Sequence, residues 1–274
     1  MKPRPFDYLR PRSVDEAIEA LAEHGDKARV LAGGQSLVAM LNFRLLAPQA
    51  LIDIGGLEEL DDIRRADGRL EIGAAVTQNR LLAEPGLARE LPLLAAALPF
   101  VGHFQTRNRG TVCGSVAHAD PSAEIPLVLA MLEGEVVLRS ARGTRNAAAD
   151  EFQRGMLATS RAPDELIVAV TLPLRTSKRV AFREVARRQG DFAIVAVAAM
   201  VEEECVRIGV GGIADRPAVR RIAARGESDI AQALDALALE LGGYDDLHAS
   251  ARMRRDLLRR IGPIVVREAL ACAA

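Results

Sequence analysis

The sequence predicts an α+β fold in two parts, on the evidence of its length, its apolar patterns and a change in composition. The chain has 274 residues, about twice the ~150 residues that one domain usually takes. Short apolar runs typical of strands are interspersed with segments whose apolar residues recur at helical spacing. Near Pro173 the sequence becomes strongly basic. We therefore expect a first domain over 1–174, with subdomains of about 1–55 and 56–174, and a C-terminal domain over 175–274 in which antiparallel strands pack with helices.

The composition is that of an ordinary globular protein and disfavours several classes. Hydrophobic residues make up 49% and charged residues 27%, and the formal net charge of -1 argues against nucleic-acid binding. Apolar runs such as Ala193–Val201 are far shorter than the ~20 residues of a membrane-spanning helix. The N-terminus lacks the apolar segment of a signal peptide, so we expect a cytoplasmic protein. Because Cys113, Cys205 and Cys272 are far apart in sequence, no zinc or iron–sulfur site is expected.

Several elements of the first domain have clear start or turn signals. Ser13 and Glu16 form the S-x-x-E pattern of a capping box, and the helix that follows ends near Gly25. Ala66-Asp67-Gly68 predicts a three-residue hairpin turn, and Asp120-Pro121 predicts the start of a helix. The other elements expected in this domain are strands over 28–31, 50–54, 63–65, 69–72, 136–139 and 165–172, helices over 37–46 and 87–98, and a short helix capped by Thr77.

The C-terminal domain is expected to begin with strands and to end with helices. A basic run over 175–188 is typical of a solvated strand face, with a docking site for a partner as the alternative. After Pro217 the pattern is helical to the end, and Ser228 is the expected cap of one helix. The long elements expected here are strands over 193–201 and 206–213 and a helix over 230–241.

The segment Ala32-Gly33-Gly34-Gln35-Ser36-Leu37 lies between an expected strand and an expected helix. Glycines can adopt positive φ and direct successive N–H groups into one concavity that suits phosphate oxygens. A helix N-terminus adds partial positive charge there, and Ser36 adds a hydroxyl. The alternative interpretation is a simple tight turn between strand and helix.

A second segment, Gly110-Thr111-Val112-Cys113-Gly114-Ser115, is also rich in small and hydroxyl residues. It leads through His118 to the turn at Asp120-Pro121. Two such segments in one domain suit the two phosphates of a dinucleotide. Since no GxGxxG pattern follows an expected strand, a Rossmann site is not indicated.

Together these segments resemble the two FAD-binding loops of a known family. AGGQSL at 32–37 and TVCGSVAHADPSAE at 111–124 are similar, in this order, to loops in the flavoprotein (medium) subunits of molybdenum hydroxylases. This family includes the carbon monoxide dehydrogenase medium subunit and the FAD domain of xanthine dehydrogenase. FDYLRP near the start, DELIVAVTLP, FREVARRQGDFA and RIGVGGIADRP also match, so the resemblance covers nearly the whole chain. It implies an FAD-binding domain like that of p-cresol methylhydroxylase (PCMH-like), followed by the C-terminal domain of such flavoproteins.

The resemblance also implies roles for individual residues. Ala32 to Leu37 would wrap the FAD pyrophosphate through backbone N–H groups, and Thr111 to Ser115 would complete the cradle from the other side. Asp120 would also contact the cofactor, and Glu124 would hydrogen-bond ribityl or ribose hydroxyls. Ile167 would lie near the flavin ring, and Arg183 would place positive charge at the ring edge.

Three further positions leave alternatives open. Val101 stands where some family members have an aromatic residue over the flavin, so stacking is in doubt. Cys113 replaces the first of two family glycines, so its φ is expected in an ordinary region, and its thiol either packs in the core or contacts the cofactor. His118 either contacts the flavin or a phosphate, or satisfies a loop carbonyl.

The function implied by the resemblance is an FAD-dependent oxidoreductase subunit. FAD would be held non-covalently, and the partners would be a small subunit with two 2Fe–2S clusters and a large subunit with the molybdenum cofactor. Electrons would pass from the clusters through FAD to an external acceptor such as NAD or a quinone, with no nucleic acid and no membrane span involved. The second segment most resembles subunits acting on N-heteroaromatic compounds. The alternatives are a stand-alone flavin oxidoreductase of PCMH-like fold and a cofactor-free scaffold subunit.

Overall fold

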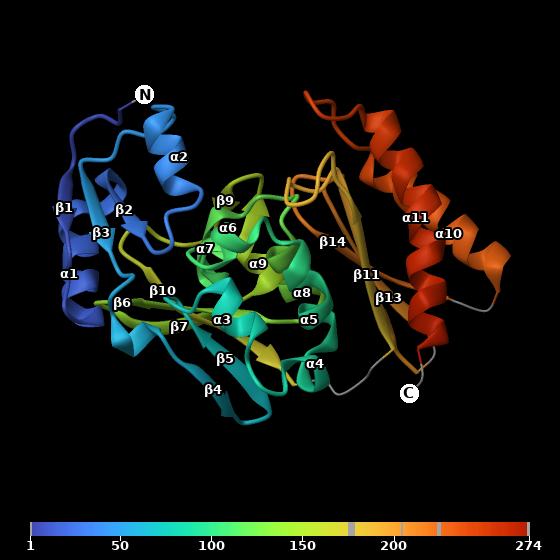
Figure 1. Ribbon diagram of the computed structural model, residues 1–274, viewed down its shortest axis with the longest axis horizontal. Coiled ribbons are helices and arrows are strands. Elements are labelled where there is room, and N and C mark those ends of the chain that lie inside the picture. The colour runs from blue at the N-terminus through green and yellow to red at the C-terminus, as the bar shows by residue number, and fades with distance from the viewer. Residues whose placement is uncertain (1, 175–178, 204, 224–225, 273–274) are drawn as a thin grey trace.

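The computed structural model describes residues 2–174, 179–203, 205–223 and 226–272, and its parts follow one another in chain order from left to right (Figure 1). The N-terminal part is built on a parallel sheet whose strands, in spatial order, are β1 (Asp7–Leu9), β3 (Ala50–Asp53) and β2 (Ala28–Leu31). Its helical segments are α1 (Val14–His24), α2 (Leu37–Asn42) and the 3-10 turns η1 (Gly25–Lys27) and η2 (Glu58–Leu60). The helix expected over 37–46 is shorter than predicted, because the chain reverses at Arg44, where φ is 59°.

Helix α1 begins as the capping signal predicts. The Ser13 hydroxyl accepts a hydrogen bond from the Glu16 amide at 3.2 Å. The Glu16 carboxylate, however, accepts from the Arg12 amide at 2.7 Å, so the reciprocal half of the capping box does not form. The apolar face of the helix is buried and consists of Val14, Ala17, Ile18 and Leu21.

The second part is built on an antiparallel sheet whose strands, in spatial order, are β4 (Ile63–Ala66), β5 (Arg69–Gly73), β10 (Leu166–Pro173), β6 (Glu135–Ser140) and β7 (Gly143–Ala148). A separate two-stranded ladder consists of β8 (Gln153–Gly155) and β9 (Ala158–Thr159). The turn between β4 and β5 has two residues, Asp67 and Gly68, with φ of 51° and 70°. The predicted three-residue turn is wrong, because Ala66 pairs with Arg69 and leaves a two-residue turn of the kind that suits strand twist.

The helices of the second part are shorter than the sequence predicted. Thr77 caps the first of them as expected, by accepting from the Arg80 amide. Pro92 splits the run expected over 87–98 into two helices. Asp120 accepts from the Ser122 amide within a turn, and the helix expected to begin there begins at Glu124. The helical segments are α3 (Gln78–Leu82), α4 (Leu87–Glu90), α5 (Pro92–Ala97), η3 (Leu98–Phe100), α6 (Phe104–Arg107), α7 (Val112–His118), α8 (Glu124–Met131) and α9 (Ala149–Phe152).

The C-terminal part is an antiparallel sheet covered by two long helices. The strands and helices are β11 (Val180–Val185), β12 (Val195–Val201), β13 (Val206–Gly211), β14 (Ala218–Ile222), α10 (Glu227–Leu241) and α11 (Ala251–Ala271). The expectation of helix from Pro217 onward is wrong for β14, which pairs with β13 at the sheet edge. Ser228 lies inside the first turn of α10, and Gly226 occupies the cap position.

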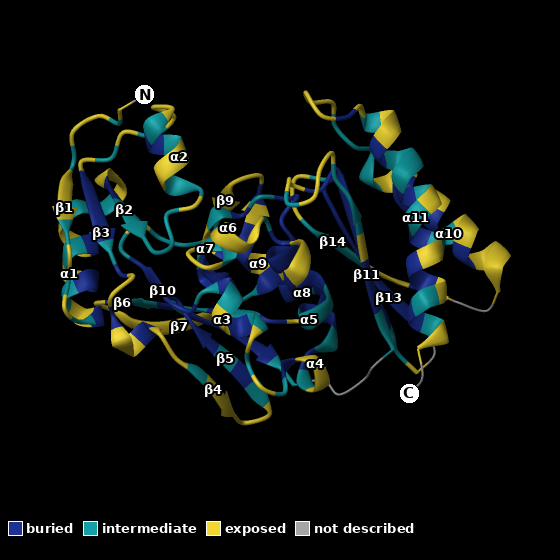
Figure 2. Cartoon of the chain, in the orientation of Figure 1, coloured by how far each residue is buried: buried dark blue, intermediate teal, exposed yellow. Residues whose placement is uncertain are grey.

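The two faces of this sheet belong to two different hydrophobic cores (Figure 2). Strand alternation directs Phe182 and Ala198 toward α5 and α8 of the second part, whereas Ala181 and Val197 face α10 and α11. Strands β12 and β13 are therefore buried on both faces. The predicted domain boundary follows residue 174, and the predicted basic run starts at residue 175. Residues 175–178 lie outside the described residues.

The predicted α+β class is confirmed by this arrangement. Over the described ranges, no helix combines the length and the apolar character needed to cross a membrane. Over the same ranges, no three His, Cys, Asp or Glu side chains gather where they could hold a metal ion.

Candidate functional site

A cleft of about 840 Å³ lies between the N-terminal sheet and the helices of the second part. Its walls come from three stretches of the chain: 26–54, 74–124 and 157–192. Figure 1 shows β2 and α2 on one side and α6, α7 and β9 on the other. The predicted site residues that line it are Ala32, Gly33, Gly34, Gln35, Ser36, Leu37, Val101, Gly110, Thr111, Cys113, Gly114, Ser115, His118, Glu124 and Ile167.

The first predicted segment forms one wall as a glycine-rich turn after β2. Gly34 has φ of 71°, which favours glycine. A Cβ on Gly33 would overlap the carbonyl oxygen of Arg109, so the two segments touch at this point. Within the part of the chain that the structure describes, the N–H groups of residues 33–36 donate no hydrogen bond to another group. These four donors are available to an anion in the cleft.

The second predicted segment is the first turn of α7 rather than an open loop. Thr111 caps the helix by accepting from the Gly114 amide at 2.9 Å. The Val112 amide donates to the Val76 carbonyl at 3.2 Å, and Val112 does not line the cleft. The expectation that Val112 helps to cradle a phosphate is therefore wrong, because its donor is already used.

Gln78, which sequence reasoning missed, holds this second segment in place. Its backbone N–H donates to the Gly110 carbonyl at 2.9 Å, and its side-chain Nε2 donates to the Thr111 carbonyl at 3.4 Å. Gln78 lines the cleft and is only 4% exposed, and its Oε1 is buried with no partner among the described residues. A buried amide oxygen of this kind is expected to accept from a bound ligand.

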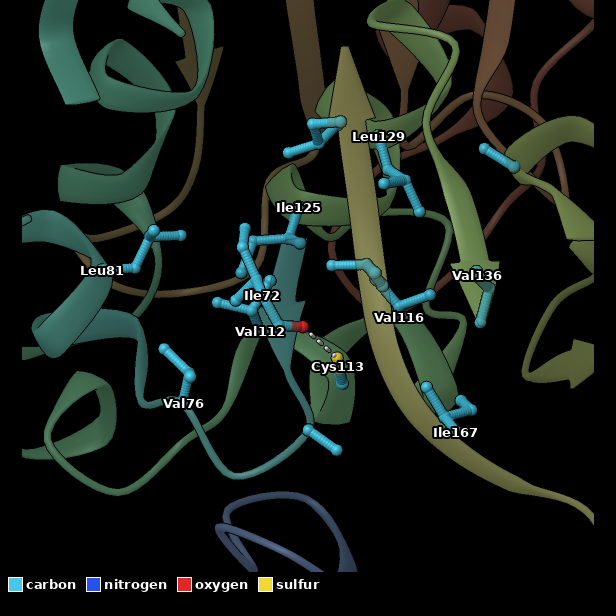
Figure 3. Packing of buried hydrophobic residues seen from close by; sticks show 14 of the residues in the cluster. Ile72, Val76, Leu81, Val112, Cys113, Val116, Ile125, Leu129, Val136 and Ile167 are labelled. Atoms are coloured by element: carbon cyan, nitrogen blue, oxygen red, sulfur yellow. Dashed lines mark hydrogen bonds between the residues drawn. The ribbon is translucent and has the colours of Figure 1, made fainter. Parts of the chain in front are cut away.

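Cys113 is held in the hydrophobic core behind the cleft wall. Figure 3 shows its thiol donating to the Ile72 carbonyl, at 3.5 Å, among Val112, Val116 and Ile167. Burial raises the pKa of the Cys113 thiol to about 12, so the group is neutral and unreactive at ordinary pH. Cys113 lies inside helix α7, so the prediction of an ordinary φ at this position is confirmed.

The polar residues after α7 divide between the cleft and the turn. Burial lowers the pKa of His118, which keeps the imidazole at the cleft neutral. Glu124 is 3% exposed, and burial, followed by the charge of Asp120, raises its pKa to about 7. The Asp120 carboxylate instead caps its own turn and does not line the cleft, so its predicted contact with the cofactor is not supported.

Arg183 lies outside the cleft, contrary to the sequence-based expectation. Its Nε donates to both Glu268 carboxylate oxygens of α11, at 2.8 and 3.0 Å. On the same strand Phe182 faces the second part and packs against Phe100, with ring centroids 5.3 Å apart. Because neighbours in a strand point to opposite faces, Arg183 must face the C-terminal helices.

Phe192 is a cleft residue that sequence reasoning did not single out. It lines the cleft beside Gly190 and Asp191, and it is 58% exposed. Gly190 has φ of 83°, which marks a turn that presents the aromatic ring between β11 and β12. The segment belongs to the FREVARRQGDFA match, which was the signal available from the sequence.

Comparison with known proteins identifies the class of this site. Residues 4–175 match a family described as the FAD binding domain in molybdopterin dehydrogenase. The chain belongs to this family, and the predicted resemblance is confirmed.

Its relatives are subunits of dehydrogenase complexes. The chain is 37% identical, over 94% of its own length and 92% of the relative's, to the 6-hydroxypseudooxynicotine dehydrogenase complex subunit alpha of Paenarthrobacter nicotinovorans. It matches quinoline 2-oxidoreductase from Pseudomonas putida 86 with a TM-score of 0.90 and 34% identity, over 98% of both chains. It matches reconstituted CO dehydrogenase from Oligotropha carboxidovorans with a TM-score of 0.93 and 28% identity, over 100% of both chains. The protein is thus an FAD-binding medium subunit of the molybdenum hydroxylase type.

The residues present suit FAD. The cleft volume is in the upper part of the range of small-molecule sites, roughly 300–1,000 Å³, as an elongated dinucleotide requires. The four unused N–H donors of residues 33–36 suit the oxygens of a diphosphate, and the buried Oε1 of Gln78 suits a hydroxyl or amine donor. Neither feature is satisfied within the described chain.

Proposed function

We propose that this chain holds one FAD non-covalently in the cleft and transfers electrons from the iron–sulfur clusters of a small partner subunit to an external acceptor. The large partner would carry the molybdenum cofactor. The observation that carries the proposal is the row of unused N–H donors at 33–36, on residues that line the same cleft as Gly114 and Ser115. FAD supplies the redox chemistry, taking up and releasing electrons singly or in pairs.

The chain's own residues bind and orient the cofactor in this proposal. The 33–36 amides hold the diphosphate from one wall. At the start of α7 the Cys113 N–H and the Ser115 hydroxyl, which have no partner among the described residues, hold it from the other, and Gln78 fixes the position of this segment through Gly110 and Thr111. Glu124 offers hydrogen bonds to ribityl or ribose hydroxyls. Ile167 and Phe192 bring apolar surface to the cleft for a flavin ring.

We also propose a cytoplasmic location and an N-heteroaromatic substrate for the assembled complex. The cysteines at 113, 205 and 272 are all free thiols, which suits a reducing compartment. Two relatives, a 6-hydroxypseudooxynicotine dehydrogenase and a quinoline oxidoreductase, have names that support this substrate class.

The test is to purify the chain, record its flavin absorbance and precipitate it with acid. We expect about one FAD per chain, with the yellow colour released into the supernatant. Colour that stays in the pellet would show a covalent bond, and a colourless protein that binds no added FAD would favour the scaffold alternative. Anaerobic addition of a reduced 2Fe–2S partner should bleach the flavin, whereas bleaching by small alcohols alone would favour a stand-alone oxidoreductase.

A further inference from the structure

Two arginines from opposite walls line the cleft. Arg29 lies on β2, and Arg161 lies between β9 and β10. The Nη1 of Arg161 donates to the carbonyls of Ala162 at 3.0 Å and Glu165 at 2.6 Å. The Nη1 of Arg29 donates to the carbonyls of Asp26 at 2.9 Å and Ala28 at 2.7 Å. Each guanidinium is therefore anchored through one nitrogen, and its other nitrogens remain for a further partner.

Neither arginine has a counter-ion among the described residues. The chain forms many Arg–carboxylate pairs, yet no carboxylate in the described ranges lies within ion-pair distance of Arg29 or Arg161. Of the nearby acids, Glu165 is occupied by Arg145 at 2.7 Å, and Asp26 contacts Arg29 only through its carbonyl oxygen. Burial, and then the charge of Arg29, lowers the pKa of Arg161, and the charges of Glu165, Asp26 and Asp164 offset this only in part.

This arrangement favours an anion between the two walls. Two like charges that face one cleft repel each other, and a half-buried cation without a partner is costly. Arginine also binds phosphate oxygens in a planar, two-pronged geometry that backbone amides do not provide. An anion that spans the cleft would therefore remove the repulsion and use the free nitrogens.

We propose that Arg29 and Arg161 form a clamp that binds the diphosphate of FAD from both walls. The inference rests on the proposed function, because the diphosphate is the anion that FAD brings to this cleft. It makes binding depend on charge as well as on the 33–36 amides, so the site selects phosphate-bearing ligands over riboflavin.

The experiment measures dissociation constants in the full-length apoprotein for FAD, for ADP in competition with FAD, and for riboflavin. Arg161→Gln and Arg29→Gln should each raise the Kd for FAD and for ADP at least tenfold, which corresponds to about 1.4 kcal/mol, and leave riboflavin unaffected. Arg161→Lys keeps the charge and should recover a measurable part of the affinity. Raising the salt concentration should weaken FAD binding in the wild type more than in either glutamine variant.

Arg220→Gln is the matched control, because Arg220 is an exposed arginine of β14 paired with Glu240 and does not line the cleft. Its affinities should equal those of the wild type. If Arg29→Gln and Arg161→Gln bind FAD and ADP within twofold of the wild type, the clamp is overturned. A folded Arg161→Gln variant that loses affinity equally for riboflavin also overturns it, because the loss is then one of packing. If the wild type itself binds no FAD, the proposed function fails instead.

Discussion

At the residue scale, the cleft depends on backbone geometry that suits glycine. Gly34 adopts positive φ, and the N–H groups of residues 33–36, its own included, donate no hydrogen bond among the described residues. A Cβ at Gly34 would lie 3.1 Å from Val38 and 3.2 Å from Leu31, tighter than most real contacts. A side chain here would therefore both strain the turn and crowd the anion site.

Gly34→Ala should cost both stability and cofactor affinity. The left-handed backbone costs about 1–2 kcal/mol for a residue with a Cβ, and the shifted amides should raise the Kd for FAD at least tenfold. Gly68→Ala is the control, because Gly68 has φ of 70° with nothing within 4 Å of a Cβ and lies outside the cleft. Urea unfolding should show similar losses of stability in the two variants. FAD titration should show a loss of affinity only in Gly34→Ala. Equal FAD affinity in both variants would show that the turn does not bind the cofactor.

Two carboxyl groups close to the cleft are held in an environment that disfavours their charge. Burial, then the charge of Glu124, raises the pKa of Glu184 to about 8, and Glu184 Oε2 is buried with no partner among the described residues. The pKa of Glu124 itself is raised to about 7, mainly by burial. Since the two groups interact, they titrate as a pair.

The pair makes stability fall as pH rises. In the unfolded chain both carboxyls ionise near their usual pKa of about 4.3, whereas the folded chain keeps their protons until about pH 7–8. The free energy of unfolding should therefore decrease between about pH 4.5 and 8 and level off above that. Glu184→Gln replaces one of these titrating carboxyls with a neutral amide, so the variant does not lose this part of the stability as pH rises. The difference in unfolding free energy between Glu184→Gln and the wild type should therefore grow across this range in favour of the variant. It should exceed about 1 kcal/mol at pH 8, after allowance for solvent screening.

Urea unfolding at pH 5 and pH 8 measures this difference. Glu151→Gln, at an exposed position on α9, is the control and should show no pH-dependent gain. A stability gain for Glu184→Gln that is the same at both pH values would contradict the linkage.

At the element scale, local signals in the sequence predicted where many helices and strands begin. The caps at Ser13 and Thr77 and the apolar runs of β12 and β13 need only neighbouring residues, so they were readable. What failed depends on distant partners. Strand β14 has five residues, two of them arginines, and it forms because it pairs with the edge of β13. The role expected of Arg183 failed because the orientation of a strand side chain follows from the packing of the whole sheet.

Arg183→Ala should therefore behave as the loss of a surface ion pair. Because Arg183 contacts Glu268 on α11 and is about half exposed, the unfolding free energy should fall only slightly. The Kd for FAD and the flavin midpoint potential should not change. Glu268→Ala should reproduce the same small loss, and the double variant should lose no more than either one. A lowered potential in Arg183→Ala with unchanged stability would restore the original placement beside the flavin.

At the scale of the whole molecule, the C-terminal sheet joins the two cores into one structure. Its β12 residues alternate between the core of the second part and that of α10 and α11. Arg254 of α11, only 1% exposed, donates to the carbonyls of Ile194 at 2.8 Å and Gly212 at 2.6 Å. The sequence predicted two segments of the cleft wall and Ile167, but it did not single out Arg161 or Phe192, and only the folded chain brings these walls together.

We expect the full chain to unfold in a single calorimetric transition, because neither core is complete without the shared sheet. Gly209 of β13 tests this coupling: a Cβ there would lie 2.6 Å from Met131 of α8, the helix that begins at Glu124. Gly209→Val should destabilise the whole chain by roughly 1–3 kcal/mol through overpacking, and by displacing α8 it should also weaken FAD binding. Gly226→Ala, with open space around its Cβ, is the control: it should cost only the small stability of a glycine N-cap and leave FAD binding unchanged. Two separate transitions, of which Gly209→Val shifts only one and leaves FAD affinity intact, would show that the C-terminal part folds independently of the cleft.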